Sequence, residues 1–188
     1  MNKYLSLLFL IFLFACGGSD EGGMDSTSNS VEELRSEQAK VAQEKLSALE
    51  EQVEADTARA DFQVRQKLLV AYANYANNFN DDPLTPEYLF RAAKLANEMG
   101  KSRRAIEYLI NLHDGFPTYG KRTEAAFLVG FIYENVLNDR IRAQEAYEKV
   151  IEFYPESTWA SEAQASIELL YLTDEEKIAK FKKQNQAQ

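Results

Sequence analysis

The sequence predicts an all-α protein in which antiparallel helix pairs stack side by side, preceded by one long helix. Two observations support this fold class. The chain is rich in Ala, Glu, Leu and Lys, and it contains only 4 prolines and 8 glycines, several of which cluster within residues 17–23. An aromatic residue followed by Asn or Pro also recurs at positions 79, 116 and 154, at intervals of 37 and 38 residues. Such a period is typical of a helical solenoid.

Residues 1–15 are expected to be a lipoprotein signal peptide. Lys3 supplies a positive charge and an apolar run covers residues 5–14, which is shorter than the roughly 20 residues that span a bilayer. Cys16, the only cysteine of the chain, ends the quartet Leu-Phe-Ala-Cys. This quartet resembles the lipobox of bacterial lipoproteins. The resemblance implies that Cys16 becomes the lipid-modified first residue and the membrane anchor.

Residues 16–29 are expected to combine the lipidated cysteine with a flexible tether. Gly, Ser and Asp dominate this stretch, and little in it can be buried.

A helix is predicted to start at Ser30, where a serine followed three residues later by glutamate forms a capping box. No breaker interrupts it before about Asn78, and we assign residues 30–65 to an N-terminal amphipathic helix. Apolar residues recur every seven positions over residues 34–69, as in a coiled coil, but the companion row is charged. Self-association through residues 31–62 therefore stays an alternative.

Small residues recur in one register within residues 66–172, which we assign to helical repeats. Ala93 and Gly130 occupy equivalent positions in two successive blocks, and Ala105 and Ala143 do so in the following helices. We predict that the first two mark close crossings of paired helices and that the latter two face them. Larger side chains at these positions would force the helices apart.

Helix breakers are predicted to separate these helices. Pro117 and Pro155 end the second helix of each pair, because proline cannot continue a helix. The tight turns within the two pairs are predicted at residues 100–102 and 138–139. Thr85, followed by proline, is predicted to be the N-cap of the first helix of a pair.

Two blocks therefore share a frame of small, aromatic, alanine and proline positions, carried by Ala93, Ala96, Ala105, Leu109 and Pro117 and by Gly130, Tyr133, Ala143, Tyr147 and Pro155. This frame resembles the tetratricopeptide repeat in its longer bacterial-envelope form. It is similar to the tetratricopeptide domains of the barrel-assembly-machine lipoprotein and the Tol–Pal coordination protein. Two features depart from the family, Ala96 in place of tyrosine and one extra residue in the second turn.

Residues 173–188 are predicted to form a C-terminal capping helix and a tail. Thr173 and Glu176 form a second capping box, and lysines dominate the end of the helix. We expect this polar helix to close the solenoid, and Trp159 to pack against it.

Composition excludes several functional classes. The formal net charge of −9 argues against nucleic acid, which needs a basic surface. His113 is the only histidine, and no pair of His or Cys has the spacing of a zinc site. We expect His113 at a solvated helix end, no cofactor and no enzymatic activity.

The resemblance implies that the first helix of each pair lines a concave groove that binds protein partners. By register, the predicted groove residues are Glu87, Phe90, Lys94, Glu124, Phe127, Phe131 and Glu134. The alternative is that the three phenylalanines are ordinary core residues.

The expected function is that of a membrane-anchored scaffold that binds envelope proteins or peptide segments. Gly17 after the cysteine favours the outer membrane, at its periplasmic face more than at the cell surface. The resemblance suggests a role in outer-membrane assembly or maintenance. One alternative is a solute- or glycan-binding accessory lipoprotein of an uptake system, and another is a purely structural oligomer.

Overall fold

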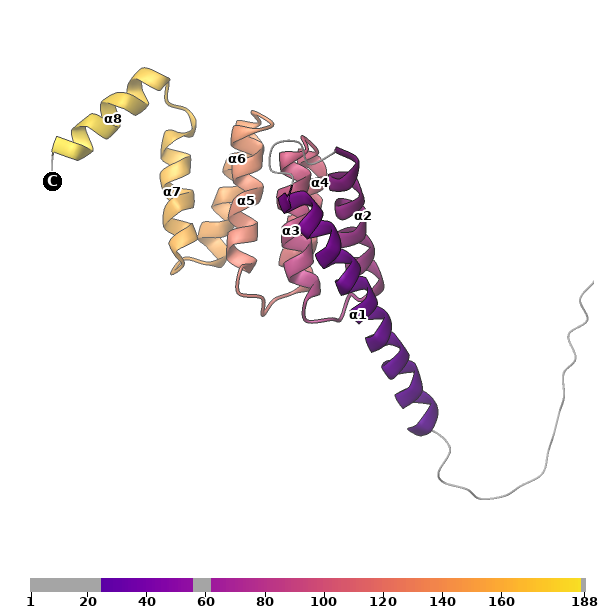
Figure 1. The fold of residues 1–188 in the computed structure, drawn as a ribbon. Helices are drawn as coiled ribbons and strands as arrows, with labels where there is room; N and C mark the ends of the chain where they lie inside the picture. The colour runs from indigo at the N-terminus through magenta and orange to yellow at the C-terminus, as the bar shows by residue number, and fades with distance from the viewer. Residues whose placement is uncertain (1–24, 56–61, 187–188) are drawn as a thin grey trace, which may run out of the picture. The chain divides into compact units, whose positions relative to one another are not determined.

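The computed structural model describes residues 25–55 and 62–186, and every regular element in these ranges is an α-helix. The all-α, repeat-type fold is therefore confirmed (Figure 1). The chain divides into two units, Met1–Gln38 and Ala39–Gln188, and the packing described below is that of the second unit. The predicted signal peptide, Cys16 and most of the tether lie outside the described residues. The helices are α1 (Asp25–Ala55), α2 (Phe62–Asn78), α3 (Thr85–Glu98), α4 (Ser102–Gly115), α5 (Arg122–Asn135), α6 (Arg140–Phe153), α7 (Thr158–Leu170) and α8 (Asp174–Gln186).

The N-terminal helix differs from the prediction of one unbroken helix from Ser30. Helix α1 already begins at Asp25 and its described part ends at Ala55. The next helix, α2, begins at Phe62. Ser30 is therefore an interior residue of α1 and does not cap it.

Side-chain hydrogen bonds show that α1 and α2 run antiparallel. The Gln43 amide donates to the Tyr75 hydroxyl at 2.7 Å, and the Tyr72 hydroxyl donates to the Glu50 carboxylate at 2.6 Å. The residue later in α1 is bonded to the residue earlier in α2, so the two helices run in opposite directions and form a hairpin. Helix propensity alone predicted continuity. The two apolar stripes, however, are buried only when the helices pack together.

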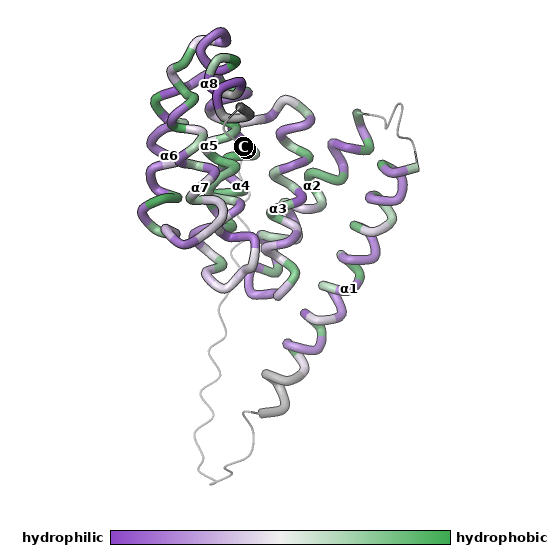
Figure 2. The backbone as a smooth tube through the Cα atoms, turned by 90° about the vertical axis from the view of Figure 1, so that its left-hand side faces the viewer, coloured by the Kyte–Doolittle hydropathy of each residue, from purple (hydrophilic) through white to green (hydrophobic). Residues whose placement is uncertain are grey.

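The buried face of α1 is not the row with seven-residue spacing. Val41 is 58% exposed and Ala48 is also exposed, whereas Leu46 is 1% exposed and packs into the core with Leu49 and Val53 beside it. The hydropathy colours of α1 in Figure 2 are accordingly mixed and mostly hydrophilic. Self-association through the exposed row stays a prediction.

Helices α3 and α4 form one hairpin, and α5 and α6 form the next. The predicted turns are confirmed, since Gly100 has a φ of +72° and Asn138 a φ of +53°, the left-handed region that glycine and asparagine tolerate best. Helix α4 ends two residues before Pro117, and α6 ends two residues before Pro155. Both prolines therefore stand where they were predicted to stop a helix.

The small residues of the repeat lie in the interior of the hairpins. Ala93 is 2% exposed, and Ala105 and Ala143 are completely buried. At Gly130, the nearest neighbour is the ring of Tyr147, one turn beyond Ala143. The need for a small side chain is confirmed at Gly130, and the three alanines are buried, as the prediction requires.

The apolar side chains form two clusters. The larger one extends from α1 to α5, and its buried aromatic residues include Tyr72, Tyr75 and Tyr88. The second joins α5, α6 and α7 around Phe127 and Tyr147. Each hairpin thus buries its apolar flank on its neighbours, which is how a solenoid is stabilised.

The start of α3 differs from the prediction. Leu84 occupies the N-cap position and makes no capping bond through its side chain, while Thr85 is already helical. The Thr85 hydroxyl instead donates to the Phe79 carbonyl at 2.5 Å, which ties α3 to the end of α2. The second capping box is confirmed, because Thr173 N donates to the Glu176 carboxylate at 2.8 Å and Glu176 N donates to Thr173 Oγ1 at 3.2 Å.

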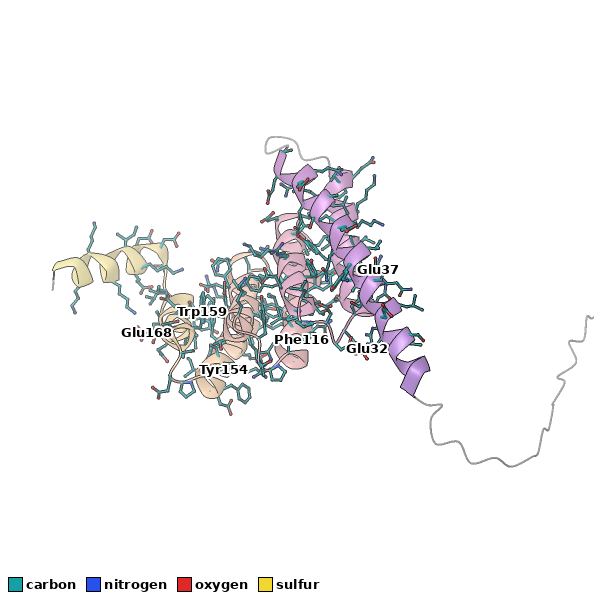
Figure 3. All side chains as sticks on the ribbon, turned by 60° about the horizontal axis from the view of Figure 1, so that its bottom comes forward. Glu32, Glu37, Phe116, Tyr154, Trp159 and Glu168 are labelled. Carbon is teal, nitrogen blue, oxygen red and sulfur yellow. The ribbon has the colours of Figure 1, made fainter. Side chains whose placement is uncertain are left out.

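Helix α8 differs from the expectation that it closes the solenoid. None of its described side chains is buried, and Lys180 of α8 forms an ion pair with Glu168 of α7 at 2.7 Å. Figure 1 shows α8 leaving the row of helices after α7, and Figure 3 labels Glu168 on α7. In the repeat register, Glu168 stands where Ala93 and Gly130 stand. The second apolar cluster has its last residues on α7, and no described side chain of α8 extends it.

Among the described residues, no helix combines the length and the apolar content that a transmembrane span requires.

Candidate binding surfaces

The predicted groove residues fall into repeated positions on α3 and α5. Phe90 and Phe127 are 37 residues apart and are 5% and 8% exposed, so both are core residues. Lys94 and Phe131 are also 37 residues apart, and both are exposed, Phe131 by 42%. The core alternative therefore holds for two of the three phenylalanines, and Phe131 remains as the aromatic residue of this face.

The three predicted acidic residues are half-buried. Glu134 accepts a hydrogen bond from the Tyr147 hydroxyl at 2.8 Å. Burial, together with this hydrogen bond, raises the pKa of Tyr147. Glu134 is thus engaged inside its own hairpin, and Glu87 is engaged between hairpins.

Glu87 is the centre of a polar network that links successive hairpins. Its carboxylate accepts from Arg91 Nε at 3.0 Å, from Lys121 Nζ at 2.9 Å and from the Tyr119 hydroxyl at 2.5 Å. Arg91 Nη1 also donates to Glu50 on α1 at 2.9 Å. Helices α1 and α3 and the segment before α5 are therefore joined through side chains that sequence analysis did not connect.

These contacts determine the ionisation of Glu87. Partial burial by itself raises the pKa of this carboxyl, but the hydrogen bonds from Tyr119, Lys121 and Arg91 outweigh it and lower the pKa to about 2. Glu87 is therefore charged and internally satisfied at neutral pH. Lys94 and Phe131 are the two predicted groove residues whose side chains are exposed.

A second surface, which sequence analysis missed, lies between α4 and α6. This hollow, the α4–α6 hollow, has a volume of about 520 Å³, and its lining comes from α4, α5 and α6, with Tyr154 at one end. Ile110 and Phe153 belong to its walls and are 43% and 61% exposed. A neighbouring hollow of about 510 Å³ shares Ile110, Tyr133 and Arg142 with it and continues toward Leu137.

The comparison with known families places a repeat in this region. Residues 124–157, which cover most of α5, all of α6 and the turn that follows, match the family model of the tetratricopeptide repeat. The chain contains a tetratricopeptide repeat. Among curated proteins, no sequence matches this chain.

The tetratricopeptide repeat of hairpin α5/α6 indicates a function in binding other proteins. Domains of this type bind protein partners, and their all-helical fold is typically non-enzymatic. The preceding hairpin α3/α4 has the same positive-φ turn and the same buried alanine, at Ala105. The chain is therefore a scaffold for protein–protein interaction.

His113 and Trp159 both have structural contacts beside this repeat. His113 Nε2 lies 2.7 Å from the Tyr154 hydroxyl, and His113 Nδ1 lies 2.7 Å from Asp114 Oδ1, so this histidine connects α4 to the end of α6. The ring centre of Trp159 is 4.9 Å from that of Phe127 on α5, so Trp159, labelled on α7 in Figure 3, packs against the second cluster. In the described ranges, no group of His, Cys, Asp and Glu side chains has the arrangement of a metal site.

Proposed function

We propose that this protein is a membrane-anchored tetratricopeptide scaffold of the bacterial envelope, which holds partner proteins close to the membrane. The observation that carries the proposal is the matched repeat of residues 124–157, within a row of hairpins whose surface is formed in advance of binding. The signal-like segment of residues 1–15 and Cys16 support the anchoring part.

The proposed mechanism is local concentration. Acyl chains on Cys16 hold the protein at a membrane, since each buried methylene contributes about 0.8 kcal/mol. The tether that the composition of residues 16–29 predicts would give the repeats reach. Partners confined to the same membrane then meet the scaffold at a high effective concentration, so modest affinities suffice. We place the protein at the outer membrane, in its assembly or maintenance.

The anchoring is tested with Cys16→Ser. The variant is expected to move from the membrane fraction to the soluble fraction, because the thiol that carries lipid is lost. A variant that stays in the membrane fraction with its signal segment attached contradicts the anchor. Protease treatment of intact cells then distinguishes the periplasmic face, where the protein is protected, from the cell surface.

The scaffold role is tested by crosslinking in living cells. Phe131→Ala combined with Lys94→Glu is expected to reduce crosslinked partners, because these two positions remain exposed on α5 and α3. Ile178→Ala is the matched control, since Ile178 is a 54% exposed apolar residue on α8. If the unmodified chain, the double variant and the control crosslink to the same partners, the face of Lys94 and Phe131 is excluded as the binding surface.

A further inference from the structure

The α4–α6 hollow corresponds to a filled position in the preceding repeat. Leu89 of α3 is 6% exposed, and Tyr108 of α4 packs against the larger apolar cluster. In the repeat register, 37 and 38 residues later, stand Ala126 and Ala146, and both line the hollow. The second repeat therefore has alanine at the two positions where the first has a buried leucine and a tyrosine packed against the core.

The floor of the hollow shows the same contrast. On α3, Ala92 and Ala96 are completely buried. Their counterparts on α5, Val129 and Tyr133, are larger but keep part of their surface exposed, and both line the hollow. Apolar surface is thus left open at a position that the fold covers one repeat earlier, which costs free energy unless something else covers it.

The charges around the hollow favour one kind of occupant. Arg142 is paired with Asp139 at 2.8 Å, whereas Lys149 forms no ion pair with the described residues and lines the hollow near Phe153. Asp114 also lines the hollow, but its carboxylate lies 2.7 Å from His113 Nδ1. An acidic group of a partner would therefore find at Lys149 a cation that has no ion pair with the described residues. Glu145 lies one turn earlier on α6 and disfavours a second acidic group on that side.

We propose that the α4–α6 hollow binds a segment of a partner protein that inserts an aromatic side chain, followed by an acidic residue that pairs with Lys149. Tyr108 shows which side chain this geometry accepts, since it occupies the equivalent place in the preceding repeat. The proposal rests on the protein-binding function proposed above and names one surface and partner chemistry for it. The hollow is bordered by the second helices of the hairpins, on α4 and α6. It is therefore separate from the face of Lys94 and Phe131.

The test uses a phage-displayed library of random dodecapeptides, selected on the full chain. Peptides with an aromatic residue and a nearby Asp or Glu are expected to be enriched. Their binding should weaken about tenfold or more in Ala146→Tyr, which fills the hollow from within, and should weaken in Lys149→Ala. Glu148→Tyr, at an exposed position of α6 that does not line the hollow, is the control and should bind as the unmodified chain does.

The fold of the filled variant is checked by thermal unfolding. Ala146→Tyr is expected to melt at or above the temperature of the unmodified chain, because Tyr108 fits at the equivalent place. If Ala146→Tyr melts at a lower temperature, the binding of peptides is compared in Lys149→Ala and Ala126→Leu instead. Ala126→Leu fills the hollow with the residue type that the preceding repeat has at position 89.

Several outcomes overturn the proposal. These are no enrichment, enriched peptides without aromatic residues, and peptides that bind the filled variants as tightly as the unmodified chain. Self-association by sedimentation that Ala146→Tyr abolishes would assign the hollow to a second copy of this chain, which also overturns it. If the crosslinked partners depend on Phe131 but not on Ala146, the scaffold function is supported and the hollow is excluded as the binding site.

Discussion

The ring of Tyr147 lies directly against Gly130, so that a Cβ placed on Gly130 would come within 2.6 Å of two ring carbons. Tyr147 is completely buried and its hydroxyl is held by Glu134, which leaves the ring little freedom to move. The two helices of the α5/α6 hairpin can approach this closely because residue 130 has no side chain.

Gly130→Ala is therefore expected to lower the free energy of unfolding by about 1–3 kcal/mol, despite the better helix propensity of alanine. Urea unfolding measures this change. Gly115→Ala is the matched control, because Gly115 is also helical and a Cβ added to it would have no atom within 4 Å. Equal stability of the two variants would mean that the Tyr147 ring moves aside at no cost.

Acid should weaken the network around Glu87. The pKa of its carboxyl is lowered to about 2 in the folded chain, below the value of 4.5 for an unperturbed glutamate. The stabilisation is thus fully present above about pH 5 and is lost as the pH falls toward 2. We expect a contribution of about 1 kcal/mol, after allowance for solvent screening.

The measurement compares thermal unfolding of the unmodified chain with Glu87→Gln at pH 7 and at pH 3. The variant should be less stable at pH 7, and the difference should shrink at pH 3. A difference that is the same at both pH values would show that Glu87 stabilises the hairpins without its charge.

The turn at Gly100 should depend on glycine for conformational reasons alone. Gly100 has a φ of +72°, and nothing lies within 4 Å of a Cβ built there. Gly100→Ala is therefore expected to cost about 1–2 kcal/mol through backbone strain and not through a clash. Gly120→Ala, also in open space but without a positive φ, should be close to neutral in the same unfolding assay.

Removal of α8 should leave the repeats intact. None of the described side chains that are lost from a chain ending at Leu172 is buried, so its free energy of unfolding should stay within about 0.5 kcal/mol of the full chain. The comparison is made by urea unfolding. A loss above about 1 kcal/mol would show that α8 caps the solenoid after all.

Local features explain which elements were predictable. The positive-φ turns at Gly100 and Asn138, the prolines after α4 and α6 and the capping box at Thr173 each depend on a few neighbouring residues. The buried alanines, Ala105 and Ala143, were found because the repeat places equivalent residues at a fixed interval. The split of the N-terminal segment into α1 and α2 has no comparable local signal.

The binding surfaces were only partly predictable. Register placed Phe90, Phe127 and Phe131 on one helix face, but burial separated two core residues from one exposed residue. The α4–α6 hollow was missed, although Ala146 in place of Tyr108 is visible in the sequence. That signal is informative only once it is known that these positions face the gap between two helices.

The sequence alone therefore determined the helical class, the repeat period and the positions that must be small, because each is a property of adjacent residues or of their spacing. Tertiary structure alone decided the pairing of α1 with α2, the network of Glu87, the open hollow and the position of α8. These features depend on how side chains from separate helices pack together. Such packing cannot be worked out from any single stretch of the chain.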